Sequence, residues 1–359
     1  MIKVLHSELQ ANIGGIESFL LNLTKSIDMS NIHFDMLMRG NNQFLEDELK
    51  KLGVTIYKVP TNPIQYYRFV KNLLKTNNYD FVHVHKNSAA NIVLPLMVKK
   101  YTNSKLIVHS HNTNPSGGSK LAVVLHKLNR NKLIELSDYR LACSDTAAEW
   151  MYGKDYKDKQ VKIIKNGIIA KNYLYDPKVR KMMRKQLELE GKFVIGHVGA
   201  FREQKNHKFL IDIFSKINIP NAELVLVGDG PLKGKIEDQV KSLKIENKVK
   251  FLGSRNDVNN ILQAFDIFVM PSLWEGLGIA AIEAQASGLP TLVSPNFPKE
   301  TKISDLIAYL SLNQPEKWID YIQNWFDTCH VRKSSLQEIN NSGYDMQLSS
   351  QIIREIYLN

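Results

Sequence analysis

Two successive runs of alternating strand-like and helix-like segments set the strongest limit on the folds open to this chain. In the first run, apolar segments at 2–5 and 80–85 alternate with helical patterns such as the one over 16–27. The alternation starts afresh at 193–199, and a polar, basic stretch places a junction near 168–190. Strands that alternate with helices are typical of a parallel sheet with helices on both faces. The sequence therefore predicts two doubly wound, Rossmann-like α/β domains that face each other across a cleft.

The composition indicates a protein of a reducing compartment. The chain has 359 residues, and 43% of them are hydrophobic, which is ample for packed cores. Its two cysteines, Cys143 and Cys329, lie far apart in sequence, which argues against a disulfide framework or a cysteine-built zinc site. No segment resembles a signal peptide or reaches the length that spans a bilayer. We therefore expect a cytoplasmic location.

The chain is strongly basic, with a formal net charge of +11. Such a surplus is compatible with nucleic acid, with an anionic membrane surface or with a substrate that carries a diphosphate. No zinc-finger spacing, RNP aromatic pattern or arginine-rich arm is present, so nucleic acid is the least favoured of these partners. A merely solvated surface explains the charge equally well.

Two acidic residues frame a glycine-containing turn in the second run. A strand-like apolar run at 266–270 is followed by this turn and then by a helical pattern. Glu275 lies in the turn and Glu283 lies on the helix, while Gly276 and Gly278 let the backbone approach a ligand closely. A helix N-terminus also attracts anions, so a phosphate flanked by hydroxyl groups would suit this stretch. The alternative is a plain strand-turn-helix unit with two solvated acids.

A glycine pair follows the first strand. Gly14 and Gly15 lie between a strand and a helix, where doubly wound proteins bind phosphates or sugars. The dinucleotide fingerprint Gly-x-Gly-x-x-Gly is missing, which disfavours a nicotinamide dehydrogenase. Taken alone, the pair is also explained by turn chemistry.

Histidines gather at two strands of the first run. His109 and His111 are two residues apart and end a strand predicted at 105–111, so their side chains can share one face. We expect a functional role for His111, because a loop-like segment at 112–119 follows it. For His83 and His85 we favour hydrogen-bonded scaffold imidazoles, since a metal site would need a third ligand that spacing does not show.

These features occur in an order that resembles the retaining glycosyltransferases of family four, which have the GT-B fold. The resemblance rests on Gly14-Gly15, His111, the segments 198–199 and 205–206, and the stretch from Glu275 to Glu283. Four passages are closer still to the branch that builds bacterial capsular and exopolysaccharides: Ser144-Asp145, 165–168, 204–207 and 282–286. The resemblance covers most of the chain, and the Glu-x7-Glu element is its most specific part.

The resemblance implies a role for each of these positions. Glu283 would bind the ribose hydroxyls of a nucleotide diphosphate sugar, Glu275 would hold hydroxyls of the donor sugar, and Lys205 would pair with the diphosphate. His111 would lie beside the sugar carbon under attack. The backbone of Gly276, Leu277 and Gly278 would contact the sugar and the diphosphate, and Gly14 and Gly15 would close on the donor. Family members use no metal, and the chain contains no Asp-x-Asp, so we expect neither a metal nor another cofactor.

The chain departs from the family pattern at one position. The family usually carries an arginine directly after Val-Gly, where it partners the lysine on the diphosphate, but Ala200 stands there. Loss of one charge-assisted contact to a diphosphate costs about 1.5–3 kcal/mol. Arg202, two residues later, is the candidate replacement.

The resemblance implies a retaining hexosyltransferase-type enzyme that moves a sugar from a UDP-linked donor onto a lipid-linked glycan. We expect residues 1–170 to form the acceptor-side domain, with a C-terminal helix at about 345–359 packed back on it, and 171–344 to bind the nucleotide sugar. The acceptor is expected to be an undecaprenyl-diphosphate-linked glycan at the inner face of the membrane, which suits the basic charge.

Two other classes of function remain open from the residues. The absence of the arginine at Ala200 is compatible with a non-catalytic subunit that only binds a nucleotide sugar. A nucleotide-sugar epimerase on the same two-domain scaffold is the other alternative. Turnover of donor with and without acceptor would separate the three.

Overall fold

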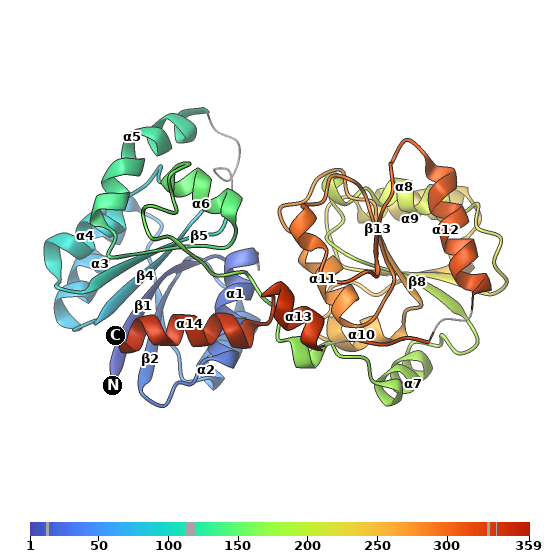
Figure 1. Ribbon diagram of the computed structural model, residues 1–359, viewed down its shortest axis with the longest axis horizontal. Helices are drawn as coiled ribbons and strands as arrows, with labels where there is room; N and C mark the ends of the chain where they lie inside the picture. The colour runs from blue at the N-terminus through green and yellow to red at the C-terminus, as the bar shows by residue number, and fades with distance from the viewer. Residues whose placement is uncertain (12–13, 113–119, 329–330, 335) are drawn as a thin grey trace. The chain divides into compact units, whose positions relative to one another are not determined.

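A computed structural model describes residues 1–11, 14–112, 120–328, 331–334 and 336–359 of the chain (Figure 1). The chain divides into two compact units. Unit 1 comprises Met1–Ile169 and Gly343–Asn359, and unit 2 comprises Ala170–Ser342. Cys329 and most of the loop predicted at 112–119 lie outside the described residues.

Unit 1 contains a parallel sheet of seven strands in the order β3-β2-β1-β4-β5-β6-β7. Its strands are β1 (Ile2–Leu9), β2 (Ile32–Met38), β3 (Thr55–Lys58), β4 (Phe81–Lys86), β5 (Lys105–Ser110), β6 (Tyr139–Ala142) and β7 (Lys162–Ile163). Its helices are α1 (Gly15–Ser26), α2 (Gln43–Lys51), α3 (Pro63–Thr76), α4 (Val93–Tyr101), α5 (Lys120–Leu136), α6 (Asp145–Tyr152) and α14 (Met346–Leu358). This strand order is that of a doubly wound fold.

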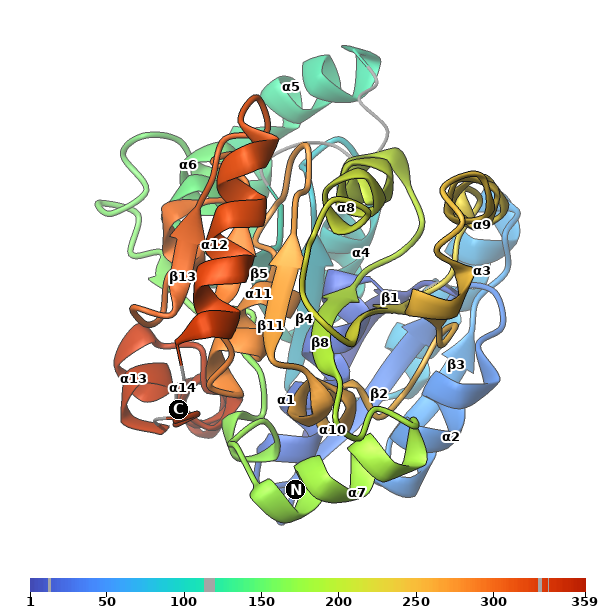
Figure 2. The same cartoon turned by 90° about the vertical axis from the view of Figure 1, so that its right-hand side faces the viewer.

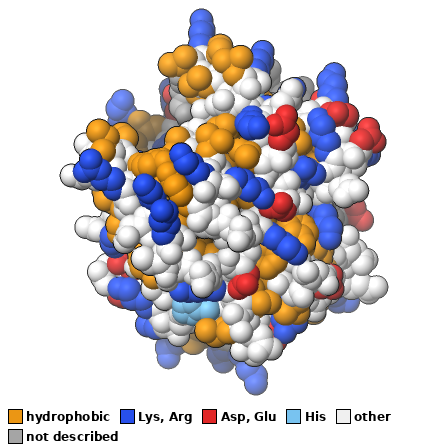
Figure 3. All heavy atoms as spheres, turned by 90° about the vertical axis from the view of Figure 1, so that its left-hand side faces the viewer, with side chains coloured by type: hydrophobic (Ala, Val, Ile, Leu, Met, Phe, Trp, Pro, Cys, Tyr) orange, Lys and Arg blue, Asp and Glu red, His pale blue; other side chains and the backbone are white. Residues whose placement is uncertain are grey.

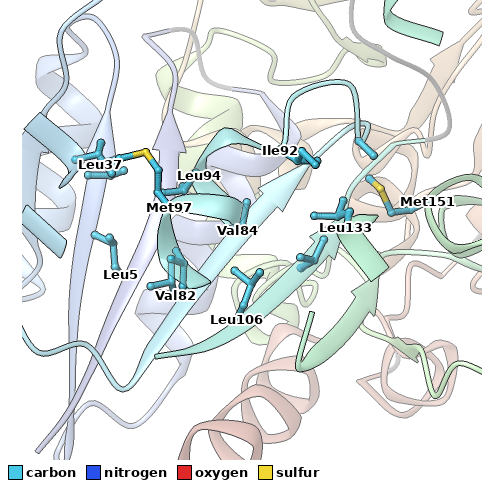
Figure 4. Packing of buried hydrophobic residues seen from close by; sticks show 14 of the residues in the cluster. Leu5, Leu37, Val82, Val84, Ile92, Leu94, Met97, Leu106, Leu133 and Met151 are labelled. Carbon is cyan, nitrogen blue, oxygen red and sulfur yellow. The ribbon is translucent and has the colours of Figure 1, made fainter. Parts of the chain in front are cut away.

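Successive side chains of the unit 1 strands point alternately into two separate cores, one on each face of the sheet. One face of the sheet packs on α3, α4, α5 and α6, and Figure 4 shows side chains such as Val82, Val84 and Leu106 pointing into this core. The other face packs on α1, α2 and α14, with Phe19 and Tyr357 among its largest buried side chains. Strands covered on both faces explain the nearly continuous apolar runs of the sequence.

Unit 2 contains a parallel sheet of six strands in the order β10-β9-β8-β11-β12-β13. Its strands are β8 (Phe193–Val198), β9 (Ala222–Val227), β10 (Val249–Phe251), β11 (Ile267–Met270), β12 (Thr291–Val293) and β13 (Ile307–Tyr309). Its helices are α7 (Pro177–Gln186), α8 (His207–Phe214), α9 (Lys233–Ser242), α10 (Val258–Ala264), α11 (Ile279–Ala286), α12 (Pro315–Asp327) and α13 (Leu336–Ser342). Figure 2 shows α8 and α12 beside each other, and both contribute to the core on one face of the sheet.

The chain leaves unit 1 and returns to it at one place. Ile168 and Asp345 form a parallel bridge, and the N–H of Met346 donates to the carbonyl of Ile168 at 2.8 Å. Gly167 makes this approach possible, because a Cβ there would lie 2.6 Å from the carbonyl oxygen of Tyr344. The last helix, α14, then covers α1 and the sheet of unit 1.

Most predicted strands are confirmed, but some boundaries were wrong. β1 continues to Leu9 instead of ending at residue 5, because it pairs with β2 as far as Met38. After β4, helix α4 begins only at Val93, because the segment 87–92 is not helical. The long helix α5 was not predicted. Within the described part of the chain, no helix combines the length and the apolar character that crossing a bilayer requires.

Histidines from three neighbouring strands lie on the face of the unit 1 sheet that α1 and α14 cover. The register pairs His6 of β1 with His83 of β4, and His85 of β4 with His109 of β5. His111 follows β5, and its ring centre lies 4.1 Å from that of His109, as the two-residue spacing predicted. The His83 ring also hydrogen-bonds the Tyr357 hydroxyl of α14 at 2.6 Å. The imidazoles at 83 and 85 are thus hydrogen-bonded, as the predicted scaffold role requires.

We expect unit 1 to lose stability in mild acid. Burial lowers the pKa of His6 to about 3 and that of His111 to about 4, so both rings are neutral in the folded chain at neutral pH. Unfolding lets them bind protons below about pH 6.5, so the free energy of unfolding should fall as the pH drops from about 6.5 toward 4. The loss for His111 alone is about 3 kcal/mol by about pH 4. Urea unfolding at a series of pH values measures it.

His109→Phe serves as the matched variant, because it keeps a buried ring without a titratable nitrogen. Burial holds the pKa of His109 well below its usual range, so its removal should make the urea midpoint depend less on pH. A variant whose midpoint falls as steeply as that of the native chain would contradict this explanation.

Candidate functional site

The site in unit 2 is organised around one ion pair. Lys205 Nζ donates to Glu275 Oε1 at 2.6 Å, and their side chains are only 18% and 6% exposed. Gln204 Nε2 lies 3.3 Å from the second carboxylate oxygen, Oε2. The structure therefore brings together two of the predicted site residues that are seventy positions apart in sequence.

Two loops at the carboxyl ends of neighbouring strands hold this ion pair. The first follows β8 and includes a 3-10 turn, η2 (Glu203–Lys205), and the second follows β11. The N–H of Leu273 donates to the Gln204 carbonyl at 2.8 Å, and Asn206 Nδ2 donates to the Pro271 carbonyl at 3.1 Å. Because these strands are adjacent and parallel, their loops meet at the edge where open α/β sheets bind ligands.

Glycines leave room for the lysine. A Cβ on Gly199 would lie 3.3 Å from the aliphatic stem of Lys205 and 3.0 Å from the His197 ring. Gly228, with φ +140°, brings the loop after β9 against this segment, because a Cβ there would lie 2.1 Å from the Gly199 carbonyl oxygen. A larger side chain at position 199 would push the ammonium group away from Glu275.

The turn before α11 has the backbone that the sequence predicted. Gly278 has φ +72°, and a Cβ there would lie 2.3 Å from the Phe297 ring. Gly276 is exposed, Leu277 is half-buried, and the carbonyl of Leu277 accepts a hydrogen bond from Thr301 Oγ1 at 2.7 Å. The first N–H groups of α11 lack partners within the helix, so they can receive an anion.

The second acid, Glu283, lies on α11, directly after the turn, and is held by a residue that was not predicted from the sequence. The Tyr173 hydroxyl donates to Glu283 Oε1 at 2.7 Å. Burial raises the pKa of Glu283 to about 7, although the bond from Tyr173 opposes this rise. A carboxyl group whose pKa is shifted this far marks a candidate functional site. Tyr173 lies in the polar stretch that predicted only a junction, so no local signal pointed to it.

His111 in unit 1 has both ring nitrogens engaged within that unit. Its Nδ1 lies 3.0 Å from Asn166 Oδ1, and its Nε2 lies 2.9 Å from His85 Nδ1. His85 Nε2 in turn lies 3.0 Å from His6 Nδ1. Since an amide oxygen only accepts, each of the three histidines carries its proton on Nδ1. Asn166 was predicted as a turn residue, and its contact with the histidine chain was missed.

The histidines also form triplets whose nitrogens lie within 4.8 Å of one another, so the third ligand that spacing did not show is present in space. The triplets are His6, His83 and His85, and His85, His109 and His111. Zinc ligands direct their lone pairs at one point. Here His83 and His85 stack with planes 21° apart, and His6 and His85 with planes 15° apart, so their lone pairs lie in nearly parallel planes. This geometry favours a hydrogen-bonded chain over a metal centre.

The glycine pair of unit 1 is organised by Glu17. This buried carboxylate accepts from the N–H of Gln10 at 2.8 Å and from that of Gly14 at 3.0 Å. A Cβ on Gly14 would lie 3.1 Å from Glu17, whereas Gly15 has no neighbour within 4 Å. Gly15 thus begins α1 with open space around it. The acid three residues after the first glycine was a capping signal that sequence reasoning did not use.

The predicted site residues therefore fall into two sets. Lys205, Glu275 and the turn 276–278 are gathered in unit 2, where Glu283 contacts Tyr173. Arg202 is exposed, and its guanidinium forms no ion pair with any residue that the structure describes. His111, Gly14 and Gly15 belong to unit 1.

Lys205→Ala should destabilise the protein by about 2–4 kcal/mol, because it leaves the buried Glu275 carboxylate without its cation. Lys205→Ala/Glu275→Ala should cost less than the sum of the single changes. Urea unfolding of all three variants measures the coupling. The control is Lys192→Ala, whose partner Glu223 is 3.5 Å away across a more exposed pair, and it should cost less than about 1 kcal/mol. Additive costs at 205 and 275 would contradict a coupled pair.

Two family models together match most of the chain. The model described as Glycosyltransferase Family 4 matches residues 13–171, and the one described as Glycosyl transferases group 1 matches 179–328. EpsF of Bacillus subtilis, named as a glycosyltransferase, is 30% identical over 99% of this chain and 96% of its own length. The capsular polysaccharide biosynthesis glycosyltransferase CapH of Staphylococcus aureus is 25% identical over 100% and 99% of the two chains.

The name of a third relative describes an enzyme that acts on a lipid-linked sugar. It is the UDP-Gal:alpha-D-GlcNAc-diphosphoundecaprenol alpha-1,3-galactosyltransferase of Escherichia coli, 26% identical over 82% of this chain and 79% of the enzyme.

Solved structures share the fold over its whole length. The glycosyltransferase from Rickettsia africae superposes with a TM-score of 0.80 at 17% identity, covering 99% of this chain and 98% of that one. Anabaena Alr3699/HepE in complex with UDP superposes with a TM-score of 0.74 at 17% identity, covering all of both chains. With its two parallel-sheet units and its matches to both family models, the chain belongs to glycosyltransferase family 4 and has the GT-B fold.

Proposed function

We propose that this chain is a retaining hexosyltransferase that moves a sugar from a UDP-sugar onto a lipid-linked glycan in capsule or exopolysaccharide synthesis. The observation that carries the proposal is the largely buried contact of 2.6 Å between Lys205 and Glu275 at the carboxyl ends of β8 and β11. A cation and a carboxylate held side by side provide one partner for a diphosphate and one for sugar hydroxyls.

The chemistry places the greatest demand on the leaving group. Cleavage of the bond between the sugar and the diphosphate leaves negative charge on the diphosphate, and fixed positive groups stabilise it. We assign this task to Lys205 and to the N–H groups of the turn at Gly276, Leu277 and Gly278. Glu275 accepts hydroxyls of the donor sugar. These groups supply the positive charge without a metal ion, so we propose a metal-independent reaction.

We assign the nucleotide to Glu283, on the helix α11 that follows this turn. Glu283 lies just past the first turn of α11, and its carboxylate, when ionised, accepts both ribose hydroxyls. The Tyr173 hydroxyl occupies one of its oxygens and fixes its orientation. The UDP and UDP-glucose complexes of HepE support UDP as the nucleotide.

Residues of unit 1 take the remaining roles in the proposal. His111 lies beside the sugar carbon under attack, and it acts as a neutral ring because burial lowers its pKa to about 4. Gly14 and Gly15 contact the donor through backbone that Glu17 fixes. Arg202, which is exposed and forms no ion pair within the described residues, replaces the family arginine that is absent at Ala200.

The acceptor assignment rests on the relatives. The Escherichia coli relative uses a diphosphoundecaprenol-linked GlcNAc by its name, and CapH acts in capsular polysaccharide biosynthesis. We therefore propose an undecaprenyl-diphosphate-linked glycan as the acceptor, and the cytoplasmic face of the membrane as the place of reaction. The formal charge of +11 suits both the diphosphate and an anionic membrane surface.

Glu275→Gln should lower sugar transfer by roughly a hundredfold or more, while UDP affinity changes by less than about threefold. The assay offers UDP-glucose or UDP-galactose with GlcNAc-diphosphoundecaprenol, and thermal shift with UDP reports binding. Glu316→Gln, an exposed acid on α12, is the control and should leave both unchanged. UDP binding without turnover of any donor would support the second candidate, a non-catalytic subunit, which the missing arginine at position 200 favours. An epimerised donor in the absence of acceptor would replace the transferase proposal.

UDP affinity should weaken by about tenfold as the pH falls from about 8 to about 6. The ribose hydroxyls donate to an ionised Glu283, and its raised pKa of about 7 means that protonation competes with binding below neutrality. Glu283→Gln cannot titrate, so its affinity should change only as the phosphates of UDP titrate, and comparison of the two proteins removes that shared effect. Calorimetry at several pH values measures both. Equal pH dependence in the two proteins would exclude Glu283 from the nucleotide site.

A further inference from the structure

Helix α5 carries an apolar stripe that no described part of its own unit covers. Leu121, Val124, Leu125 and Leu128 recur at the spacing of one helical face, and all four are exposed, Leu121 by 67% and Leu128 by 72%. The buried side of the same helix carries Leu133, which packs in the core. A helix with one apolar face packed and a second one in solvent is unusual for a soluble surface.

The neighbouring helix extends this apolar surface. α4 packs beside α5, and its Val93 and Leu96 are 41% and 43% exposed. α3 packs beside α4 in turn, with Ile64 exposed in its first turn. Isolated surface leucines need no explanation, but an exposed apolar set on three adjacent helices marks an interaction site. We call this set, with its surrounding charges, the α3–α5 face.

The charges of the α3–α5 face are almost all positive. The only acid on the three helices is Glu135, and their basic residues are Arg68, Lys71, Lys75, Lys99, Lys100, Lys120, Lys127, Arg130 and Lys132. Figure 3 looks at this side of the molecule, where basic and hydrophobic side chains lie among one another and acidic ones are few. The excess of one sign selects an anionic partner.

Three of the lysines gather around one aromatic ring. The Nζ atoms of Lys71, Lys75 and Lys100 lie 5.4, 5.6 and 5.5 Å from the ring centre of Tyr101, whose hydroxyl lies 2.7 Å from that of Tyr67. Ammonium groups repel one another, and no acidic side chain of the described chain forms an ion pair with these three. Tyrosine with surrounding lysines is typical of the boundary between lipid headgroups and acyl chains.

We infer that the α3–α5 face docks on a bilayer of anionic phospholipids. The apolar stripe of α5 enters the boundary between headgroups and acyl chains, while the lysines bind lipid phosphates. A protein partner is less suited, because protein interfaces are depleted in lysine and this face is rich in it. The purpose of docking, which is to reach a lipid-linked acceptor, rests on the proposed function. The docking itself does not depend on that function.

Sedimentation of the full chain with vesicles tests the inference without donor or acceptor. We expect binding to vesicles of phosphatidylcholine with phosphatidylglycerol and little binding to phosphatidylcholine alone. Lys71→Gln/Lys75→Gln/Lys100→Gln should weaken binding roughly a hundredfold, because each lysine near the surface contributes about a fivefold effect. Leu121→Glu/Leu128→Glu should weaken it by at least as much, since it removes the apolar insertion.

Controls from unit 2 match each change. Leu243→Glu alters an exposed leucine directly after α9, and Lys241→Gln alters a lysine in the last turn of α9; both should bind vesicles like the native chain. UDP thermal shift should be unchanged in every variant, so failure of docking is distinguishable from failure of the transferase proposal. No sedimentation with anionic vesicles, equal binding to both kinds of vesicle, or native binding by both face variants would overturn the inference. Inorganic phosphate added to the vesicles tests whether free phosphate competes for the same lysines. If it displaces the chain only when the ionic strength becomes high, the ligand is lipid and not free phosphate.

Discussion

The contact between Lys205 and Glu275 depends on two strands being neighbours, and much of unit 2 is arranged to make it. β8 and β11 lie side by side in the sheet, so the loops that follow them share hydrogen bonds at Leu273 and Asn206. Gly199 leaves space for the lysine stem, and Gly228 closes the next loop against it. A partly buried ion pair contributes little net stability, but its geometry is fixed before any ligand arrives. Preorganised charge of this kind is what a departing diphosphate requires.

Unit 1 also holds polar groups in a fixed geometry, but these groups are neutral. Asn166, His111, His85 and His6 form one hydrogen-bonded chain, and the amide oxygen at one end sets the tautomer of every ring. Burial keeps these rings uncharged at neutral pH. The fixed pair in unit 2 is charged, whereas the histidines under α1 and α14 stay neutral.

Features encoded locally could be predicted from the sequence. Strand and helix periods predicted both doubly wound units, and the glycines and the helical pattern after 266–270 predicted the turn and helix α11. Features that depend on register or on distant partners could not be predicted. Tyr173 reaches Glu283 across more than a hundred residues, and the histidines meet only because β1, β4 and β5 are adjacent. Helix α5 escaped prediction because its two apolar stripes on opposite sides blur the single-face period that identifies a helix.

Unit 2 is an insertion between the body of unit 1 and its last helix, and this order has a consequence during synthesis. Ribosomes deliver residues 170–342 before α14, so unit 2 can collapse while the histidine-bearing face of unit 1 still lacks the helix that carries Tyr357. The first unit to be translated is therefore the last to be finished. A nascent chain that stops before α14 would present that uncovered face to chaperones.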